Sequence, residues 1–331
     1  MKAIVFEQFG EPASVLSLRE VPRPEPGPGQ VRVRMLAAPI NPSDLLYIRG
    51  NYGKRPGLPS TPGFEGVGIV DSAGPGLYGR LLVGKRVVIP NSVTGSWAEA
   101  AIATARQAIP ISQNLPLEQA AMFFVNPAAA YIMTRKVLSV PQGEWLLQTA
   151  AGSALGKMVI RLGKKFGFKT INVVRRREQI AELKSLGADV VLAEVDGDIT
   201  EQVQKATGGI GVRYAVDPVG GATGSAVVRS LAAGGKMLVF GTLSDEPLSF
   251  SPRELMTRDA SLSGFWLGNY MSRLRLLGKL KLIRTISSLM VEGVLVSEAG
   301  GTFSLGQFSE ALASAERPAR GGKSLFKMAD A

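Results

Sequence analysis

A short run of small residues, QTAAGSALGK at residues 148–157, has the composition of a loop that holds a phosphate group. An apolar segment precedes it and a helical pattern follows it, so backbone N–H groups can meet an anion at a positive helix N-terminus. The glycines of a G-x-G-x-x-G dinucleotide motif would fall at positions 151, 153 and 156, and only the last is present. An ordinary tight turn is the alternative. The strand–loop–helix setting favours dinucleotide binding by Ala151, Gly152, Ser153, Ala154, Leu155 and Gly156.

Three consecutive arginines, Arg175 to Arg177, end the next predicted strand. About 20 residues beyond the loop, a site for NAD places an acidic residue that binds the ribose hydroxyls. Guanidinium groups instead suit a 2′-phosphate, to which they donate charge-assisted, bidentate hydrogen bonds. The sequence therefore favours NADPH over NADH, with Arg175 and Arg177 at the phosphate; a solvated helix start is the alternative. Gly220 and Gly241, at the ends of two later predicted strands, are also assigned to cofactor binding.

The chain contains no Cys and no His. This excludes disulfides, thiolate nucleophiles, Cys/His zinc sites, Ser-His-Asp triads and histidine general acids. No clustered spacing of Asp and Glu indicates a carboxylate metal site, so we expect no metal. The chemistry must therefore use Tyr, Ser, Thr, Asn, Lys, Arg, a carboxylate or an organic cofactor.

The net charge of +11 favours anionic partners such as phosphate-bearing cofactors, acidic carriers or nucleic acid. Basic residues are spread along the chain without a low-complexity tail or an interleaved basic and aromatic pattern, so nucleic acid is the weaker interpretation. No run approaches the roughly 20 apolar residues of a membrane span. No signal-peptide pattern opens the chain. We expect a soluble, cytoplasmic protein.

The elements that must position these residues fall into two regions. A length of 331 residues fits roughly two domains. The first 120 residues are rich in Gly and Pro, and short apolar segments predict strands at 1–6, 30–38, 66–73 and 85–90. This first region is expected to be a compact, β-rich domain with few helices.

The pattern changes after Pro116, where an Ala-rich helix is predicted over 117–138 with an interruption at Pro127. Strands and helices then alternate in βα units of about 25 residues, which predicts an α/β fold with a parallel sheet covered on both faces. A strand at 261–268 precedes a long basic amphipathic helix at 271–292. A helix within 303–316 and a strand at 322–328 close the chain.

With these motifs, the chain resembles the medium-chain dehydrogenase/reductase superfamily over its whole length. The resemblance is carried by the phosphate loop and by MKAIVFEQFGEP, APINPSDL (38–45), PGFEGVGIV (62–70) and VDPVGG (216–221). It implies a GroES-like catalytic domain at 1–121, a Rossmann domain with a doubly wound parallel sheet at 122–265, and a segment, 266–331, that returns to the catalytic domain. Cofactor and substrate are expected between the domains. Asn41 and Phe64 stand where zinc-dependent members have Cys and His, so the zinc-free branch is implied.

Within that branch, the chain is most similar to 2-enoyl thioester reductases of the mitochondrial enoyl-CoA reductase type. The segments INPSDLLYIRGNYG (40–53), FFVNPAAAY (123–131), TINVVRRR (170–177) and SGFWL (263–267) carry this similarity. It implies that Tyr52, in GNYG, lies over the nicotinamide and the substrate carbonyl. A tyrosine O–H can hydrogen-bond the enolate that forms when hydride reaches the β-carbon, and can help to supply the α-proton. A loop tyrosine packed at a domain edge is the alternative.

Other residues receive weaker assignments. Asn41 is a catalytic candidate that would fix the nicotinamide or Tyr52, although Asn-Pro turn chemistry also explains it. The resemblance implies that Phe265 and Trp266 lie at the cofactor and the acyl pocket; as bare sequence they are equally good core aromatics. Glu65 is expected in a structural salt bridge. The basic run from Arg273 to Arg284 is interpreted as a solvated face, with contact to CoA phosphates or an acidic carrier as the alternative.

The leading hypothesis is an NADPH-dependent reductase of 2-enoyl thioesters, carried by CoA or by a carrier protein. A quinone or enone reductase on the same scaffold is the first alternative, because a fold does not fix a substrate. A dinucleotide-binding protein without turnover is the second, and an RNA-binding role is the third. The resemblance also implies a homodimer formed by joining edge strands of the two nucleotide-binding sheets.

Overall fold

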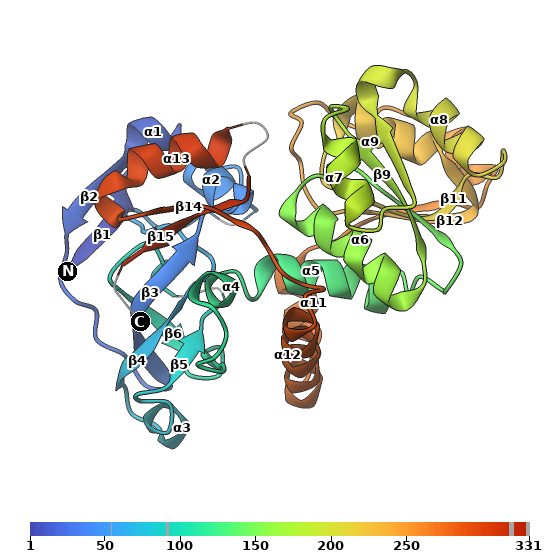
Figure 1. Cartoon of the computed structure of the whole chain (residues 1–331). Coiled ribbons are helices and arrows are strands. Elements are labelled where there is room, and N and C mark those ends of the chain that lie inside the picture. Colours follow the sequence, from blue (N-terminus) through green and yellow to red (C-terminus); the bar gives the residue numbers. More distant parts are fainter. Residues whose placement is uncertain (54, 91–92, 318–320, 329–331) are drawn as a thin grey trace. The chain divides into compact units, whose positions relative to one another are not determined.

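The chain forms two compact units, each of which is described by itself (Figure 1). The computed structural model describes residues 1–53, 55–90, 93–317 and 321–328. Unit 1 combines Met1–Val125 with Ser297–Ala331, and unit 2 is Asn126–Val296. The parallel sheet of unit 2 and the mostly antiparallel sheets of unit 1 confirm the predicted α/β class with a β-rich first domain. No helix within the described ranges is long and apolar enough to cross a membrane.

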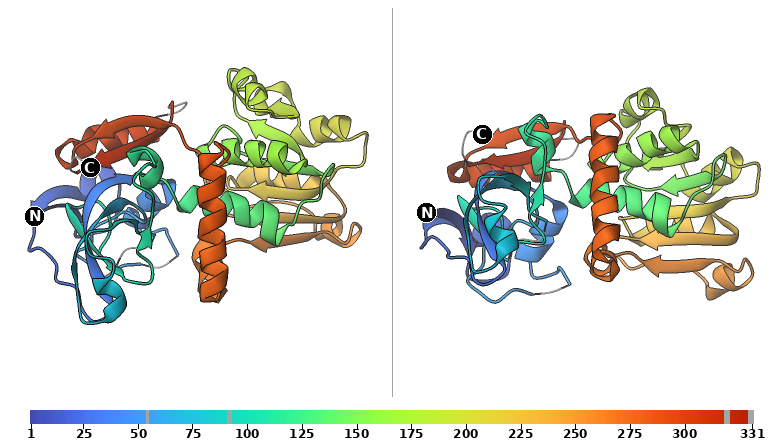
Figure 2. Two further views of the ribbon diagram at one scale, coloured as in Figure 1. Left: turned by 60° about the horizontal axis from the view of Figure 1, so that its bottom comes forward. Right: turned by 90° about the horizontal axis from the view of Figure 1, so that it is seen from below.

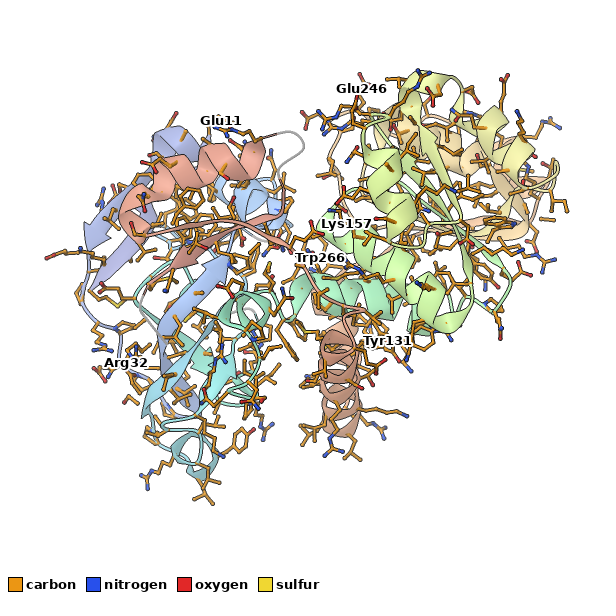
Figure 3. The ribbon with its side chains drawn as sticks, in the orientation of Figure 1. Glu11, Arg32, Tyr131, Lys157, Glu246 and Trp266 are labelled. Carbon is orange, nitrogen blue, oxygen red and sulfur yellow. The ribbon has the colours of Figure 1, made fainter. Side chains whose placement is uncertain are left out.

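Unit 1 is built around one long central strand, β3 (Gln30–Pro39), which pairs with three others. Val31, Val33 and Met35 alternate along it and are fully buried, as the period of two in a strand requires. Arg32 points to the other face (Figure 3) and donates from Nε to Asp71 at 2.9 Å. The remaining strands of unit 1 are β1 (Lys2–Phe6), β2 (Leu16–Glu20), β4 (Val67–Ala73), β5 (Arg86–Val88), β6 (Ala100–Thr104), β7 (Ile109–Pro110), β14 (Ala299–Phe303) and β15 (Lys323–Lys327).

Short helices connect these strands, and the end of the chain completes the core. Phe326 of β15 lies at ring contact with Trp97, with centroids 5.1 Å apart, in a cluster that also contains Phe6, Ile48 and Leu312. Strand β14 was not predicted, because AGGTF has no apolar alternation. The helices of unit 1 are α1 (Pro12–Val15), α2 (Pro42–Ile48), α3 (Leu77–Arg80), α4 (Leu117–Ala121) and α13 (Phe308–Glu316).

Unit 2 contains a parallel sheet with the strand order β10-β9-β8-β11-β12-β13 in its described residues. Figure 2 shows β13, in orange, at one edge. The order reverses between β8 and β11, so the sheet is doubly wound with a switch point between these strands. The strands are β8 (Trp145–Gln148), β9 (Lys169–Val174), β10 (Val190–Ala193), β11 (Val212–Asp217), β12 (Leu231–Val239) and β13 (Ser261–Gly264). The helices are α5 (Val125–Ile132), α6 (Ala154–Phe166), α7 (Gln179–Ser185), α8 (Ile199–Ala206), α9 (Gly221–Arg229), α10 (Pro252–Met256), α11 (Leu267–Arg273) and α12 (Leu276–Val291).

The helix predicted over 117–138 is interrupted before Pro127 rather than at it. Helix α4 ends at Ala121, α5 begins at Val125, and Pro127 lies in the first turn of α5. A proline is tolerated there because the first turn leaves its N–H groups without helical partners. A π-helical turn, Met133–Val137, follows directly.

The basic helix predicted over 271–292 is two helices. Leu274 and Arg275 have extended backbone, with ψ of 130° and 161°, between α11 and α12. Helix α12 buries Leu282 and Ile286 and belongs to unit 2. The return to unit 1 therefore begins at Ser297, not at residue 266 as the sequence suggested.

Candidate active site

The predicted phosphate loop joins the central strand β8 to the N-terminus of the thirteen-residue helix α6. Ser153 caps this helix, and its Oγ accepts a hydrogen bond from the Gly156 N–H at 3.1 Å. A Cβ on Gly156 would lie 2.4 Å from the carbonyl oxygen of Ala151, so only glycine fits this close approach. Ala150, just before the motif, has a left-handed backbone with φ of 48°. The degenerate motif therefore keeps its glycine where the backbone requires one.

The arginines after β9 differ in their partners. Arg177 donates from Nε to Asp196, in an ion pair on the surface. Arg175 and Arg176 make no side-chain hydrogen bond or ion pair with another described residue. Two guanidinium groups are thus available to an anion at the carboxyl end of β9, while Arg177 would first have to leave or share Asp196.

A buried carboxylate that sequence reasoning missed links the strands on both sides of the switch point. Asp217, at the end of β11, is fully buried and accepts a hydrogen bond from the hydroxyl of Thr149, just after β8. It also accepts from the N–H of Gly220 at 2.9 Å. Asp217 thereby fixes the loop that begins α9. The acid in VDPVGG, directly at a strand end, was the signal for it.

Gly241 lies in the neighbouring loop, after β12. A Cβ there would be 2.9 Å from the carbonyl oxygen of Pro218, so the two loops pack closely. The N–H of Leu243 also donates to this oxygen at 3.0 Å. Gly220 and Gly241 therefore lie on adjacent loops at one edge of the sheet.

Phe265 and Trp266 follow the edge strand β13, so they share the carboxyl edge of the sheet with the other candidate cofactor residues. They line a separate pocket of about 290 Å³ together with Tyr270 and Arg273. No residue of the phosphate loop lines that pocket. The structure thus brings the cofactor candidates to one edge but does not bring all of them into one cavity.

Lys157 projects from the first turns of α6 (Figure 3). It makes an ion pair with Glu182 of α7. This pair joins α6, which follows the phosphate loop, to α7, which follows the three arginines. No sequence pattern predicts this pair. It supports the relative placement of these two segments.

In unit 1, the ring of Tyr52 is stacked against that of Phe64, the residue that stands where a zinc ligand would be expected. Its ring lies 4.8 Å from that of Phe64, tilted by 36°. The ring of Tyr47 meets Phe64 edge-on at 5.2 Å, and its hydroxyl lies 3.2 Å from that of Ser60. Burial raises the pKa of Tyr52 to about 12, and the negative charge of Asp44 adds to this shift. The phenol therefore stays protonated and remains a hydrogen-bond donor at neutral pH.

Tyr52 opens onto a groove of about 890 Å³ within unit 1. This volume lies in the range of small-molecule sites. Tyr47 and Phe64 line the groove beside Tyr52. The further lining side chains are mostly apolar and come from the start of the chain, from residues 55–61 and from the segment 93–100: Met1, Val5, Val21, Pro22, Pro24, Arg55, Pro56, Pro59, Ser60, Thr61, Val93, Thr94, Ala98 and Ala100.

Asn41 is buried in a polar network and does not line this groove. Its Nδ2 donates to Glu65 Oε1 at 3.2 Å, and its Oδ1 accepts from Lys323 Nζ. Lys323 also lies 3.9 Å from Glu65, and both side chains are almost fully buried, which confirms the structural salt bridge expected for Glu65. Both ends of the Asn41 amide are therefore occupied within unit 1. Its catalytic role stays a prediction.

Glu65 and Asp44 tie this network to the backbone. The second Glu65 oxygen accepts from the N–H groups of Phe124 and Val125, at 3.1 and 2.9 Å. Asp44 accepts from the N–H of Asn41 at 2.7 Å and from that of Phe64 at 2.9 Å. Burial raises the pKa of Asp44 to about 7, and the two N–H donors partly oppose this shift. The acid at the third helical position after Asn41 is a capping pattern that the sequence displays.

Metal chemistry has no support in the side chains present. The chain has no His or Cys, and no group of three or more Asp and Glu in the described part of the chain could hold a metal ion.

Comparison with known proteins identifies both units. Residues 27–113 match the family model of the alcohol dehydrogenase GroES-like domain, and residues 154–281 match that of the zinc-binding dehydrogenases. Mitochondrial enoyl-[acyl-carrier-protein] reductase of Rattus norvegicus is 34% identical over 322 residues, which are 96% of this chain and 86% of the relative.

Solved structures share the whole architecture. The Escherichia coli quinone oxidoreductase, complexed with NADPH, has a TM-score of 0.91 and 26% identity over 99% of this chain and 100% of that chain. The Etr1p complex with NADP and crotonyl-CoA has a TM-score of 0.83 and 26% identity over 98% of this chain and 99% of that chain.

Proposed function

Because the chain belongs to the medium-chain dehydrogenase/reductase superfamily, with enoyl reductases and quinone oxidoreductases among its relatives, we propose that it is an NADPH-dependent reductase of 2-enoyl thioesters. It is an oxidoreductase of the zinc-free kind, since it lacks every Cys and His ligand. The identity with mitochondrial enoyl-[acyl-carrier-protein] reductase supports an enoyl substrate, and the Etr1p complex supports a thioester carried by CoA.

The residues of unit 2 fit a phosphorylated dinucleotide. The close approach at Gly156 and the Ser153 cap form a cradle at the start of α6, where N–H groups and the helix dipole favour a diphosphate. Arg175 and Arg176 would hold the 2′-phosphate, and Arg177 would join them on release from Asp196. Gly220, Gly241, Phe265 and Trp266 extend this site along the carboxyl edge of the sheet. Bound NADPH supplies the hydride.

Tyr52 carries the proposal, because it is a protonated phenol that opens onto a large, mostly apolar groove. Its Oη donates a hydrogen bond to the thioester oxygen, where negative charge develops as the β-carbon is reduced. With a pKa of about 12, Tyr52 stays a donor throughout and does not become an anion that would repel the enolate. Tyr52 holds its proton at this oxygen, and water supplies the proton that the α-carbon receives.

Replacement of Tyr52 by Phe tests this role. We expect Tyr52→Phe to lower kcat for crotonyl-CoA by roughly 10²-fold, because one oxyanion donor is lost, and to leave NADPH binding unchanged. The measurement is the loss of reduced-nicotinamide absorbance with crotonyl-CoA, together with a fluorescence titration of NADPH. Tyr78→Phe, at an exposed tyrosine of α3, is the matched control. Equal rates for Tyr52→Phe and the parent would contradict the role.

A quinone or enone reductase is the second candidate, favoured by the similarity to the E. coli quinone oxidoreductase over the whole chain. It predicts turnover of a simple quinone that is indifferent to the CoA moiety and to Tyr52. The same absorbance assay with a quinone separates the two candidates. Binding of NADPH without turnover of either acceptor would favour a non-catalytic role.

The assembly proposed for the chain is a homodimer. Strand β13 lies at an edge of the unit 2 sheet, and its outer side pairs with no other described strand. Two copies joined along β13 would continue the sheet. Sedimentation equilibrium measures the mass directly, and a monomer at micromolar concentration would refute this assembly. The cytoplasmic location stays a prediction, since the rat relative is named mitochondrial.

A further inference from the structure

We propose that the groove in unit 1 holds the acyl chain of the substrate, from Tyr52 along β1 to Val21, and that the protein therefore favours long 2-enoyl thioesters. This inference rests on the proposed function and deepens it. It adds the chain-length preference, which neither the motifs nor the family matches specify.

The hydrogen bonds around β1 give the groove its direction. At one end, Phe6 pairs with Ser60, whose hydroxyl lies 3.2 Å from that of Tyr47 beside Phe64. At the other end, the N–H of Val21 donates to the carbonyl oxygen of Met1 at 2.9 Å. The groove thus runs from the Tyr52 end to Val21 along β1. The five residues of β1 span about 16 Å at ~3.3 Å per residue, which is much longer than a crotonyl chain.

The lining matches a hydrocarbon. Beyond the tyrosines, the lining includes the apolar side chains of Val5, Ala98, Ala100, Val21 and Pro24. The two alanines are small and fill little of the groove. No carboxylate is among the described lining residues. The Arg55 side chain donates to the Gly50 carbonyl oxygen and lies over the Phe9 ring, and the N-terminal amino group of Met1 donates to the carbonyl oxygen of Val21 at 2.9 Å. An apolar surface of this kind binds a longer acyl chain more tightly, because each methylene group that it buries strengthens binding by up to about fourfold.

A phosphopantetheine arm fits the far part of this groove less well. Its amides and phosphate need hydrogen-bond donors, and the stretch around Val21 and Pro24 offers mainly apolar side chains. Prolines there have no N–H to donate. The acyl chain is therefore the occupant to which we commit.

A charge placed at the far end tests the assignment. Val21 is half-buried and remote from Tyr52 along the groove, so Val21→Glu places a carboxylate against the end of a long chain only. The assay compares kcat/KM for dodec-2-enoyl-CoA and crotonyl-CoA. We expect the parent protein to prefer the longer thioester. We expect Val21→Glu to lower kcat/KM for dodec-2-enoyl-CoA at least tenfold and to leave that for crotonyl-CoA within twofold.

Val83→Glu is the matched control, since Val83 is an exposed valine of unit 1 outside the groove. Thermal unfolding of both variants checks that the fold is intact. An equal loss for both thioesters would place the pantetheine arm in the groove and overturn the proposal. Unchanged kcat/KM values for both would overturn it as well, because the far end of the groove would then bind neither. If the parent protein reduces neither thioester, the proposed function itself fails and this inference falls with it. Turnover of crotonyl-CoA without a preference for the longer chain refutes only the inference.

Discussion

The contact between Tyr52 and Phe64 sets both the position and the protonation of the proposed donor. Phe64 is itself fixed, because its N–H donates to Asp44 at 2.9 Å and its ring is held edge-on by Tyr47. The stacked ring keeps water from one side of Tyr52. Phe64 is therefore a positioning residue, although it stands where zinc-dependent members of the superfamily have a metal ligand.

Replacing Phe64 by Asn is expected to lower the pKa of Tyr52 from about 12 toward its ordinary value of 10, because water enters beside the phenol. We expect kcat to fall by about tenfold as the phenol loses its fixed orientation. Phenolate absorbance against pH, taken as the difference from Tyr52→Phe in the same background, measures this shift. Phe64→Tyr keeps the ring contact and should retain both properties. A Tyr52 pKa that is the same in Phe64→Asn would refute the positioning role.

The buried Asp44 makes stability depend on pH. Its pKa is about 7 in the folded protein against 3.8 ordinarily, so the folded state favours the protonated form. This contribution is fully present below about pH 4 and is lost as the pH rises through 7. Asp44→Asn cannot titrate. We expect the free energy of unfolding of the parent, relative to Asp44→Asn, to fall by up to about 4 kcal/mol between pH 4 and 7 and then to stay level.

Urea unfolding at several pH values measures this difference. Asp245→Asn, at an exposed acid, is the control and should track the parent protein throughout. Parallel curves for the parent and Asp44→Asn would mean that the pKa of Asp44 is not raised in the folded protein.

At the scale of elements, the junction of β8 with α6 depends on one glycine. A side chain at residue 156 would press against the Ala151 carbonyl, which is backbone and cannot move aside cheaply. We expect Gly156→Ala to weaken NADPH binding at least tenfold, because the loop must open at the proposed diphosphate site. Fluorescence titration measures the affinity.

Gly278→Ala is the control for this change, since Gly278 lies inside α12 with no contact closer than 3.5 Å to an added Cβ. Alanine there favours the helix by up to about 1 kcal/mol. Undiminished NADPH affinity in Gly156→Ala would show that the diphosphate does not bind at this loop.

Sequence patterns predicted the strands and helices correctly where a local hydrophobic period determines the structure. The alternation in β3 and the βα units from β8 to β12 follow from burial of one face, and the α/β class follows from them. No proline or glycine marks the break between α11 and α12 at Leu274. Strand β14 was not predictable either, because it is a strand only through its pairing with β15. Lys323 was missed for a related reason. Its partner Asn41 is 282 residues away in the sequence, and no local pattern predicts a contact between residues so far apart.

At the scale of the whole molecule, the net charge of +11 attracts the CoA thioesters proposed as substrates, because these are polyanions. Electrostatic attraction raises association rates, and salt screens it. We expect kcat/KM for crotonyl-CoA to fall about tenfold between low and half-molar salt, with NADPH saturating. The N-acetylcysteamine thioester of crotonate carries no phosphate and is the control. Equal salt dependence for both thioesters would show that the charge acts on the fold or the cofactor instead.

The return of the chain to unit 1 has a consequence for synthesis. Unit 2 is one continuous segment, Asn126–Val296, so its sheet can close while the ribosome is still making the rest. Unit 1 cannot be completed then, because Phe326 fills its core beside Trp97 and Lys323 neutralises the buried Glu65. Residues 1–125 are thus made before unit 2 but reach their native state after it. Until β15 has left the ribosome, Glu65 is an uncompensated carboxylate and the core beside Trp97 is unfilled.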